Sequence, residues 1–230
     1  MSARQIEPEW LDELPAGDAR ALRARRDLRR LNSWMLQPAI MARLLIRHVL
    51  GRPRKMLDLG AGDGTFTLRV ARRLARRWPH VTVTLVDRHK AAGSDTIAGF
   101  DAVGWRVEVT TADVHEFLEW PAAFDVIGAN LFLHHLPPDD LVRLFARVAQ
   151  MTPLFVACEP ERTEWALLAS RLIWAIGCGE VTRHDAPASV RAGFRGRELS
   201  SLWPTGGDWA LHEHVRLFTH CFVARRGSQP

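Results

Sequence analysis

The sequence predicts an α/β fold built on a doubly wound sheet, and three observations support this. Between residues 54 and 158, short apolar runs alternate with amphipathic stretches, which is typical of a parallel sheet with helices on both faces. The first apolar run ends in a turn that carries glycines at alternate positions. Residues 209–225 alternate apolar and polar side chains twice, with a break near Leu217, as two antiparallel strands would.

The elements follow in order along the chain. Asp18 is expected to cap a helix, and Pro38 to open a second helix over residues 39–50 that Gly51 ends. The alternating region then predicts strands at 55–59, 81–86, 105–111, 123–129 and 153–158, and helices at 65–78, 89–99, 115–119 and 138–150. Right-handed crossovers place a switch point near the first strand.

The region after the last of these strands is expected to form a cap. Residues 164–177 are apolar almost all round, which predicts a helix buried on every side, under a cap, along an apolar pocket or in a homodimer contact. Residues 182–196 are polar and predicted to be irregular, and a short helix follows at 197–203. We therefore divide the chain into an N-terminal arm and helical cap (1–50), a core (51–160), an insert (161–204) and a closing hairpin of the same domain (205–230).

Composition narrows the class of protein. The 230 residues are 47% hydrophobic, enough for one domain with a core, and no apolar run is long enough to span a membrane. Three cysteines without metal-ligand spacing, and an acidic N-terminus without a signal peptide, predict a cytoplasmic protein with reduced thiols. The net charge of +5 comes without a lysine tract, a Gly-Arg repeat or an aromatic-basic stripe, so we do not expect a nucleic-acid partner.

The arginines of residues 20–30 lie mostly opposite the apolar stripe of the first long helix. A solvated basic face is the interpretation we favour. A lid or a surface for an anionic partner is the alternative.

The glycine turn carries the strongest functional signal. Gly60, Gly62 and Gly64 follow the first strand and would let a ligand approach the backbone at a helix N-terminus. A dinucleotide fingerprint has its third glycine one residue later. Asp58 precedes the turn, and a carboxylate there suits an ammonium or sulfonium ligand better than a pyrophosphate.

This segment resembles the first motif of the class I S-adenosylmethionine-dependent methyltransferases, an acidic residue followed by x-G-x-G-x-G. Later segments extend the resemblance over about residues 50–160. It implies a Rossmann-like sheet of seven strands with a closing antiparallel hairpin, and S-adenosyl-L-methionine as the cofactor. In this family N-terminal helices cover the substrate.

Two acidic strand ends continue the resemblance. Asp87 ends the second strand and suits a ribose diol, although it could instead cap the helix that begins at Arg88. The resemblance places Asp113 at the adenine amino group and the backbone of Val114 at the ring. The expected cofactor-binding residues are Asp58, Gly60, Ala61, Gly62, Gly64, Asp87, Arg88, Asp113, Val114 and Asn130.

The catalytic candidates lie near the ends of the fourth and fifth strands. They are His134, His135 and Glu159, with His184 on the insert, and one could take the proton of an acceptor hydroxyl. A structural role is the alternative for each. We expect one of the two adjacent histidine rings to face the pocket and the other to face away. The sequence lacks a pattern of two acids and an asparagine, so no metal site is expected. The remaining histidines are expected to be structural or on the surface: His80, His89, His115, His212, His214 and His220.

The insert loosely resembles that of bacterial small-molecule methyltransferases of polyketide and quinone-type pathways. The resemblance implies a small aromatic or lipophilic acceptor, methylated on a phenolic oxygen or a ring carbon. A protein or RNA methyltransferase is one alternative, although Asn130-Leu131-Phe132-Leu133 replaces the Asn/Asp-Pro-Pro-aromatic motif of amino-methylating enzymes. A non-catalytic protein that binds the cofactor to regulate or scaffold a partner is another.

Overall fold

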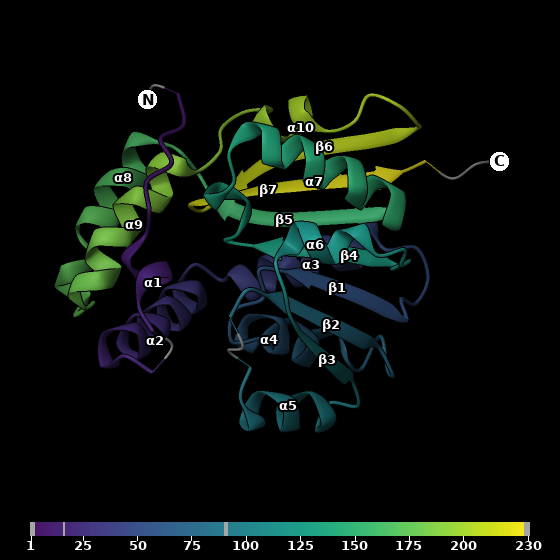
Figure 1. Cartoon of the computed structure of the whole chain (residues 1–230), viewed down its shortest axis with the longest axis horizontal. Coiled ribbons are helices and arrows are strands. Elements are labelled where there is room, and N and C mark those ends of the chain that lie inside the picture. Colours follow the sequence, from purple (N-terminus) through teal and green to yellow (C-terminus); the bar gives the residue numbers. More distant parts are fainter. Residues whose placement is uncertain (1–2, 16, 90–91, 228–230) are drawn as a thin grey trace.

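The computed structural model describes residues 3–15, 17–89 and 92–227. A seven-stranded sheet in the order β3-β2-β1-β4-β5-β7-β6 forms its centre (Figure 1). The first five strands pair in parallel, whereas β7 is antiparallel to both β5 and β6. The order reverses at β1, as in doubly wound folds. This confirms the predicted architecture, including the closing hairpin.

The strands lie close to their predicted positions: β1 Lys55–Leu59, β2 Thr82–Asp87, β3 Arg106–Thr111, β4 Val126–Asn130, β5 Leu154–Pro160, β6 Trp209–Arg216 and β7 Thr219–Arg226. The α-helices are α1 Trp10–Glu13, α2 Ala19–Trp34, α3 Gln37–His48, α4 Thr65–Leu74, α5 Ser94–Asp101, α6 Val114–Glu119, α7 Pro138–Met151, α8 Glu164–Arg171, α9 Glu180–Ala192 and α10 Glu198–Leu202. Two 3₁₀ turns, η1 Leu133–His135 and η2 Ile173–Ile176, complete the order.

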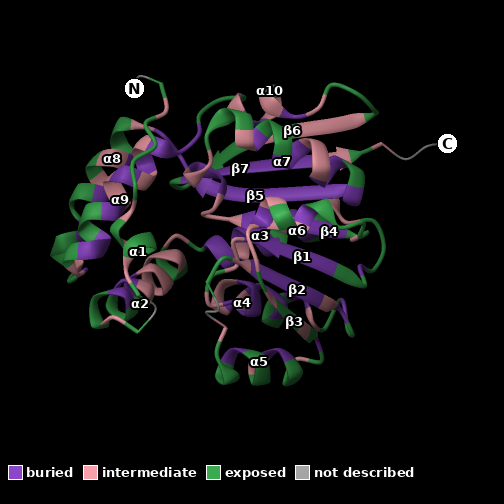
Figure 2. Cartoon of the chain, in the orientation of Figure 1, coloured by how far each residue is buried: buried purple, intermediate pink, exposed green. Residues whose placement is uncertain are grey.

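Two apolar clusters cover the two faces of the sheet. Helices α3, α4 and α5 pack on one face, where Leu45 and Leu74 belong to the buried cluster. Helices α6, α7 and α10 cover the other face, where Phe145 and Trp203 are buried. Figure 2 shows β1 and β5 almost wholly buried, as expected of strands covered on both faces. The three cysteines are buried and free, as predicted.

A separate group of helices stands at one edge of the sheet. In Figure 1, α1, α2, α8 and α9 lie together on the side toward which β4 and β5 point. Because the parallel strands share this direction, the helices face the carboxyl edge, where ligands bind in folds of this kind.

The insert differs from its prediction in two respects. Residues 164–177 are not buried on every side: α8 and η2 bury Ala166 and Ile173, but the side chains of Trp165 and Trp174 are exposed. Residues 182–192 are not irregular, because α9 is a regular helix despite Pro187 in its interior, whereas residues 193–196 lie outside any helix as predicted. A proline there costs about 3 kcal/mol, and we infer that packing of α9 against α1, α2 and α8 offsets this cost.

Several boundaries also shift. The helix predicted at 89–99 begins at Ser94, with residues 90 and 91 outside the described part, and the helix predicted to reach residue 78 ends at Leu74. The N-terminal arm contains the short α1, and Asp18 caps α2 as expected through its contact with the amide of Arg20. Within the described residues, no helix is long and apolar enough to cross a membrane.

Candidate active site

A cavity of about 800 Å³ opens at the carboxyl edge of the sheet. One part of its wall comes from the ends of β1, β2 and β3 and the loop after β4. The other part comes from the helices at this edge, and it is mainly apolar. The apolar residues that α2, α8, η2 and α9 and the segment after α2 contribute are Leu28, Leu31, Met35, Ala166, Ala169, Ile173 and Val190.

The glycine turn forms the floor of the first part. Gly60, Gly62 and Gly64 all have positive φ angles, which glycine adopts most readily. A Cβ on Gly60 would overlap Phe132, whereas a Cβ on Gly62 would meet no protein atom within 4 Å. Gly60 and Gly62 line the cavity. The turn therefore leaves open space at Gly62, as a ligand-binding turn requires.

Asp87 holds this turn in place. One oxygen of its carboxylate accepts from the amide of Gly62 at 2.8 Å, and the other accepts from the amide of His89 at 2.9 Å. Asp87 and the exposed Arg88 both line the cavity. The carboxylate keeps further lone pairs, so it can bind a hydroxyl while it orders the turn.

Asp113 and Val114 lie at the start of α6, also on the cavity wall. The Asp113 side chain caps this helix by accepting from the amide of His115 at 2.8 Å. Asp113 therefore has a structural contact in addition to its predicted role at the cofactor.

Four of the predicted cofactor residues are not among the described residues that line the cavity: Asp58, Ala61, Gly64 and Asn130. Asp58 is buried and accepts from the hydroxyl of Thr67. Burial raises the pKa of Asp58 to about 7, and the nearby Asp87 adds to this rise. Asp58 therefore lies in β1 beneath the glycine turn and does not face the cavity.

Several buried polar atoms at the cavity have no hydrogen-bond partner among the described atoms. They include the side-chain oxygens of Asn32 and Gln37 and Nε2 of His115, all on residues of the wall, and the side-chain oxygen of Asn130 at the end of β4. An unpaired buried polar group is costly, and those of Asn32, Gln37 and His115 belong to residues that also line the cavity. Asn32 and Gln37 were not predicted from the sequence, and His115 was expected to be structural or on the surface.

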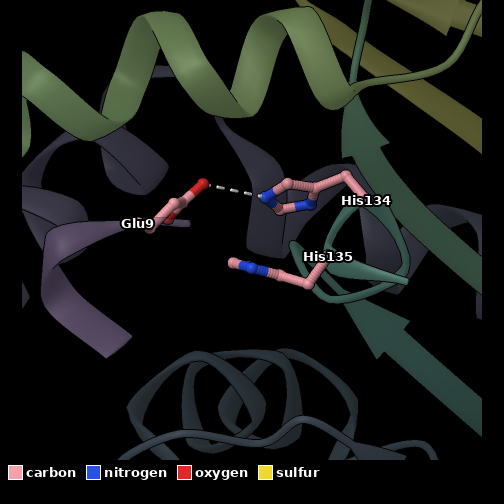
Figure 3. Close-up of side chains that lie close together, drawn as sticks. All are labelled: Glu9, His134 and His135. Atoms are coloured by element: carbon pink, nitrogen blue, oxygen red, sulfur yellow. Dashed lines mark ion pairs between the residues drawn. The ribbon is translucent and has the colours of Figure 1, made fainter. Parts of the chain in front are cut away.

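His134 is the most constrained side chain of the site. It is buried, and its Nδ1 lies 2.7 Å from Oε2 of Glu159 while its Nε2 lies 3.5 Å from Oε1 of Glu9 (Figure 3). Burial alone would lower the pKa of His134, but the hydrogen bonds to Glu159 and Glu9 outweigh it and raise the pKa to about 9. The ring is therefore held between two carboxylates.

His135 lies beside this ring and also reaches the cavity. The ring centroids of His134 and His135 are 4.2 Å apart, and Nδ1 of His135 lies 3.3 Å from Asp12. Figure 3 shows both rings extending from η1 toward Glu9. The prediction that one ring faces away is wrong, since both residues line the cavity. A 3₁₀ turn, which we did not predict, brings the two adjacent side chains to the same side.

Glu159 supports η1 from below. It is fully buried, and its carboxylate accepts from the amides of Phe132 and Leu133 at 3.0 and 2.9 Å, and from that of His134 at 3.3 Å. Both oxygens are engaged, so Glu159 is suited to positioning His134 and not to contact with an acceptor.

The N-terminal arm completes this end of the cavity. Glu9 accepts from the hydroxyl of Ser189 on α9, and Asp185 accepts from the amides of Trp10 and Leu11 at 2.9 and 3.0 Å. His184 stacks on Trp10 with ring centroids 3.8 Å apart. His184 is not among the described residues that line the cavity. Glu9 and Asp12 do line it, although neither was a candidate from the sequence.

Comparison with known proteins agrees with this geometry. Residues 56–153 match the family model described as "Methyltransferase domain". The match agrees with the resemblance to the class I S-adenosylmethionine-dependent methyltransferases. The matched region coincides with β1 to α7, the part of the chain that carries the glycine turn.

Relatives and solved structures extend the likeness. Trans-aconitate 2-methyltransferase of Mycobacterium tuberculosis is 34% identical over 102 residues, which cover 44% of this chain and 35% of the relative. The chain thus spans about a third of the length of the curated relatives it matches. A plantazolicin methyltransferase in complex with SAH superposes with a TM-score of 0.65 at 10% identity and covers 92% of each chain. An O-methyltransferase family protein of Burkholderia thailandensis superposes with a TM-score of 0.52 at 20% identity, over 84% of this chain and 59% of that protein. These structural likenesses support the fold.

The residues of the cavity fit S-adenosylmethionine, the cofactor of this class. We infer that the Asp87 carboxylate would hold the ribose hydroxyls, and that the open space at Gly62 would admit the cofactor. The cofactor supplies a methyl group on a positively charged sulfur, which is already activated for transfer.

Proposed function

We propose that this protein is an S-adenosylmethionine-dependent methyltransferase that acts on a small aromatic or lipophilic acceptor, at a phenolic oxygen or a ring carbon, in natural-product or quinone-type metabolism. The observation that carries the proposal is the cavity itself. One wall contains the glycine turn and Asp87, and the opposite helices supply an apolar wall. Such a combination of apolar lining and a few polar groups is typical of small-molecule sites.

The chain's own residues would contribute mainly position and exclusion of water. Positioning two reactants can supply about 7–11 kcal/mol of a barrier. The apolar side chains of α2, α8 and α9 would desolvate the acceptor, and its hydroxyl would face the polar group of Glu9, His134 and His135. We propose that this group favours loss of the hydroxyl proton, with Glu159 and Asp12 positioning the two rings.

A guanidinium group of the insert could bind a carboxylate or phenolate of the acceptor, and the insert carries Arg191, Arg195 and Arg197. They are not among the described lining residues, and Arg191 pairs with Glu7 at 2.8 Å. The acceptor is therefore proposed to be recognised by shape and by the histidine end of the cavity.

The test is an acceptor screen with methyl-labelled S-adenosylmethionine. The purified protein is incubated with phenols, quinols and electron-rich ring compounds, and products are identified by mass spectrometry. Transfer to oxygen or to ring carbon would support the proposal and distinguish its two forms. Transfer to peptide or RNA, with none to the small molecules, would favour the macromolecular alternative. Cofactor binding without any transfer would favour a regulatory or scaffold role.

A further inference from the structure

Glu9, His134 and His135 form a compact group of potential metal ligands. A ring nitrogen of each histidine and a carboxylate oxygen of Glu9 all lie within 4.8 Å of one another. The residues come from the N-terminal arm and from η1, about 125 positions apart in the chain (134 − 9). Only the tertiary structure brings them together, so the sequence offered no spacing that would predict a metal site.

The distance between the ligand atoms of Glu9 and His134 suits a tetrahedral ion. Zinc binds histidine nitrogen and carboxylate oxygen at about 2.0–2.2 Å, which places two ligand atoms of a tetrahedron about 3.4 Å apart. Nε2 of His134 and Oε1 of Glu9 are 3.5 Å apart. A ring nitrogen of His135 lies within 4.8 Å of both other ligand atoms and would complete a set of two histidines and one carboxylate.

The carboxylates next to the two histidines also support a metal site. Histidines that bind metals commonly donate their other ring N–H to a carboxylate, which fixes the tautomer and orients the ring. His134 has Glu159 at its Nδ1, 2.7 Å away, and His135 has Asp12 at its Nδ1, 3.3 Å away. Each histidine thus has a carboxylate behind it, and the second nitrogen of each ring remains for a ligand.

The charges also favour a cation at this point. Glu159 is buried and Glu9 is partly buried against His134, and carboxylates removed from water are costly unless a positive charge lies near them. All three ligand residues line the cavity, so an ion here would keep an open coordination position toward a bound acceptor.

We propose that Glu9, His134 and His135 form a site for a divalent transition-metal ion of the Zn²⁺ class, with Glu159 and Asp12 as supporting carboxylates. Resting on the proposed function, the ion would bind the acceptor's hydroxyl oxygen and favour its ionisation. Mg²⁺ prefers oxygen ligands and is not expected to bind with comparable affinity.

The experiment measures metal binding without reference to turnover. The full chain, freed of metal with a chelator, is titrated with Zn²⁺ in a calorimeter and with Co²⁺ in an absorption spectrometer. We expect one ion per chain and the visible bands of a low-symmetry Co²⁺ site, with no comparable binding of Mg²⁺. His135→Ala and Glu9→Gln should each weaken Zn²⁺ at least 100-fold, and Asp12→Asn by about 10–100-fold, as loss of a supporting group does.

His80→Asn is the matched control, because it removes an exposed imidazole on the turn before β2, and asparagine tolerates its φ of 61°. It should bind Zn²⁺ as the wild type does. Melting temperature and S-adenosylhomocysteine affinity verify that each variant is folded. The proposal would be overturned if the chain does not bind Zn²⁺ stoichiometrically. It would also be overturned if folded Glu9→Gln and His135→Ala bind Zn²⁺ as tightly as the wild type does. Methyl transfer by the metal-free chain alongside either result would leave the proposed function standing.

Discussion

Replacing Gly62 by alanine separates ligand binding from backbone strain. Gly62 has a φ of 55°, and an added Cβ would meet no protein atom within 4 Å. The cost within the chain is therefore that of the left-handed conformation alone, about 1–2 kcal/mol. For a domain of this size each 1 kcal/mol lowers the melting temperature by about 2–4 °C, so a decrease of about 2–8 °C is expected.

The methyl group would also occupy space that we assign to the cofactor. We expect S-adenosylhomocysteine to bind at least tenfold more weakly, which corresponds to about 1.4 kcal/mol or more. Gly51→Ala is the matched control. Gly51 has a φ of 82° with open space around it, and it lies on the turn before β1, away from the described lining residues.

The assay is calorimetric titration of both variants, with melting curves measured in parallel. The two should lose similar stability, but only Gly62→Ala should lose affinity. If Gly62→Ala binds S-adenosylhomocysteine as tightly as Gly51→Ala does, the turn is structural and the assignment of the cofactor to it is wrong.

Three further variants test the site. Asp87→Asn should weaken S-adenosylhomocysteine about tenfold or more, since hydrogen bonds to a charged group contribute about 1.5–3 kcal/mol each; unchanged calorimetric affinity would refute the ribose assignment. The folded-state pKa of Asp58 is raised from 3.8 to about 7. The contribution of Asp58 to the free energy of unfolding is therefore fully present below pH 4, where the carboxyl is protonated in both states, and it is lost as the pH rises through 7. Asp58→Asn should therefore gain stability relative to the wild type by about 1.4 kcal/mol per pH unit across that window, and parallel denaturation profiles would contradict this. His135→Ala should lower turnover about 10²-fold with cofactor affinity nearly unchanged, whereas wild-type turnover would shift the role to His134.

The fold could be predicted largely from the sequence because its signals are local. Buried parallel strands are continuous apolar runs, and glycines at positive φ mark the turn after β1. The acidic strand ends Asp87 and Asp113 follow from the same pattern, because parallel strands bring their carboxyl ends to one edge. Both line the cavity as expected.

The predictions that failed depended on contacts between distant segments. Residues 164–177 looked uniformly apolar, yet Trp165 is exposed, because hydrophobicity alone does not say which face a neighbour covers. The segment with Pro187 looked irregular, yet it forms α9, which packs against three other helices. Propensity is a weak guide where tertiary packing decides.

The site also contains residues that local sequence patterns predict and residues that only tertiary contacts bring together. The sequence by itself determined the glycine turn and the acidic strand ends, since each lies within one strand-turn-helix unit. Only the tertiary structure placed Glu9 and Asp12 at His134 and His135, and Asn32 on the cavity wall. Such contacts join segments that no local pattern links. They form because the arm and α2 fold back over the carboxyl edge of the sheet, where the sum of packing and charge interactions, and not any local preference, determines which side chains meet.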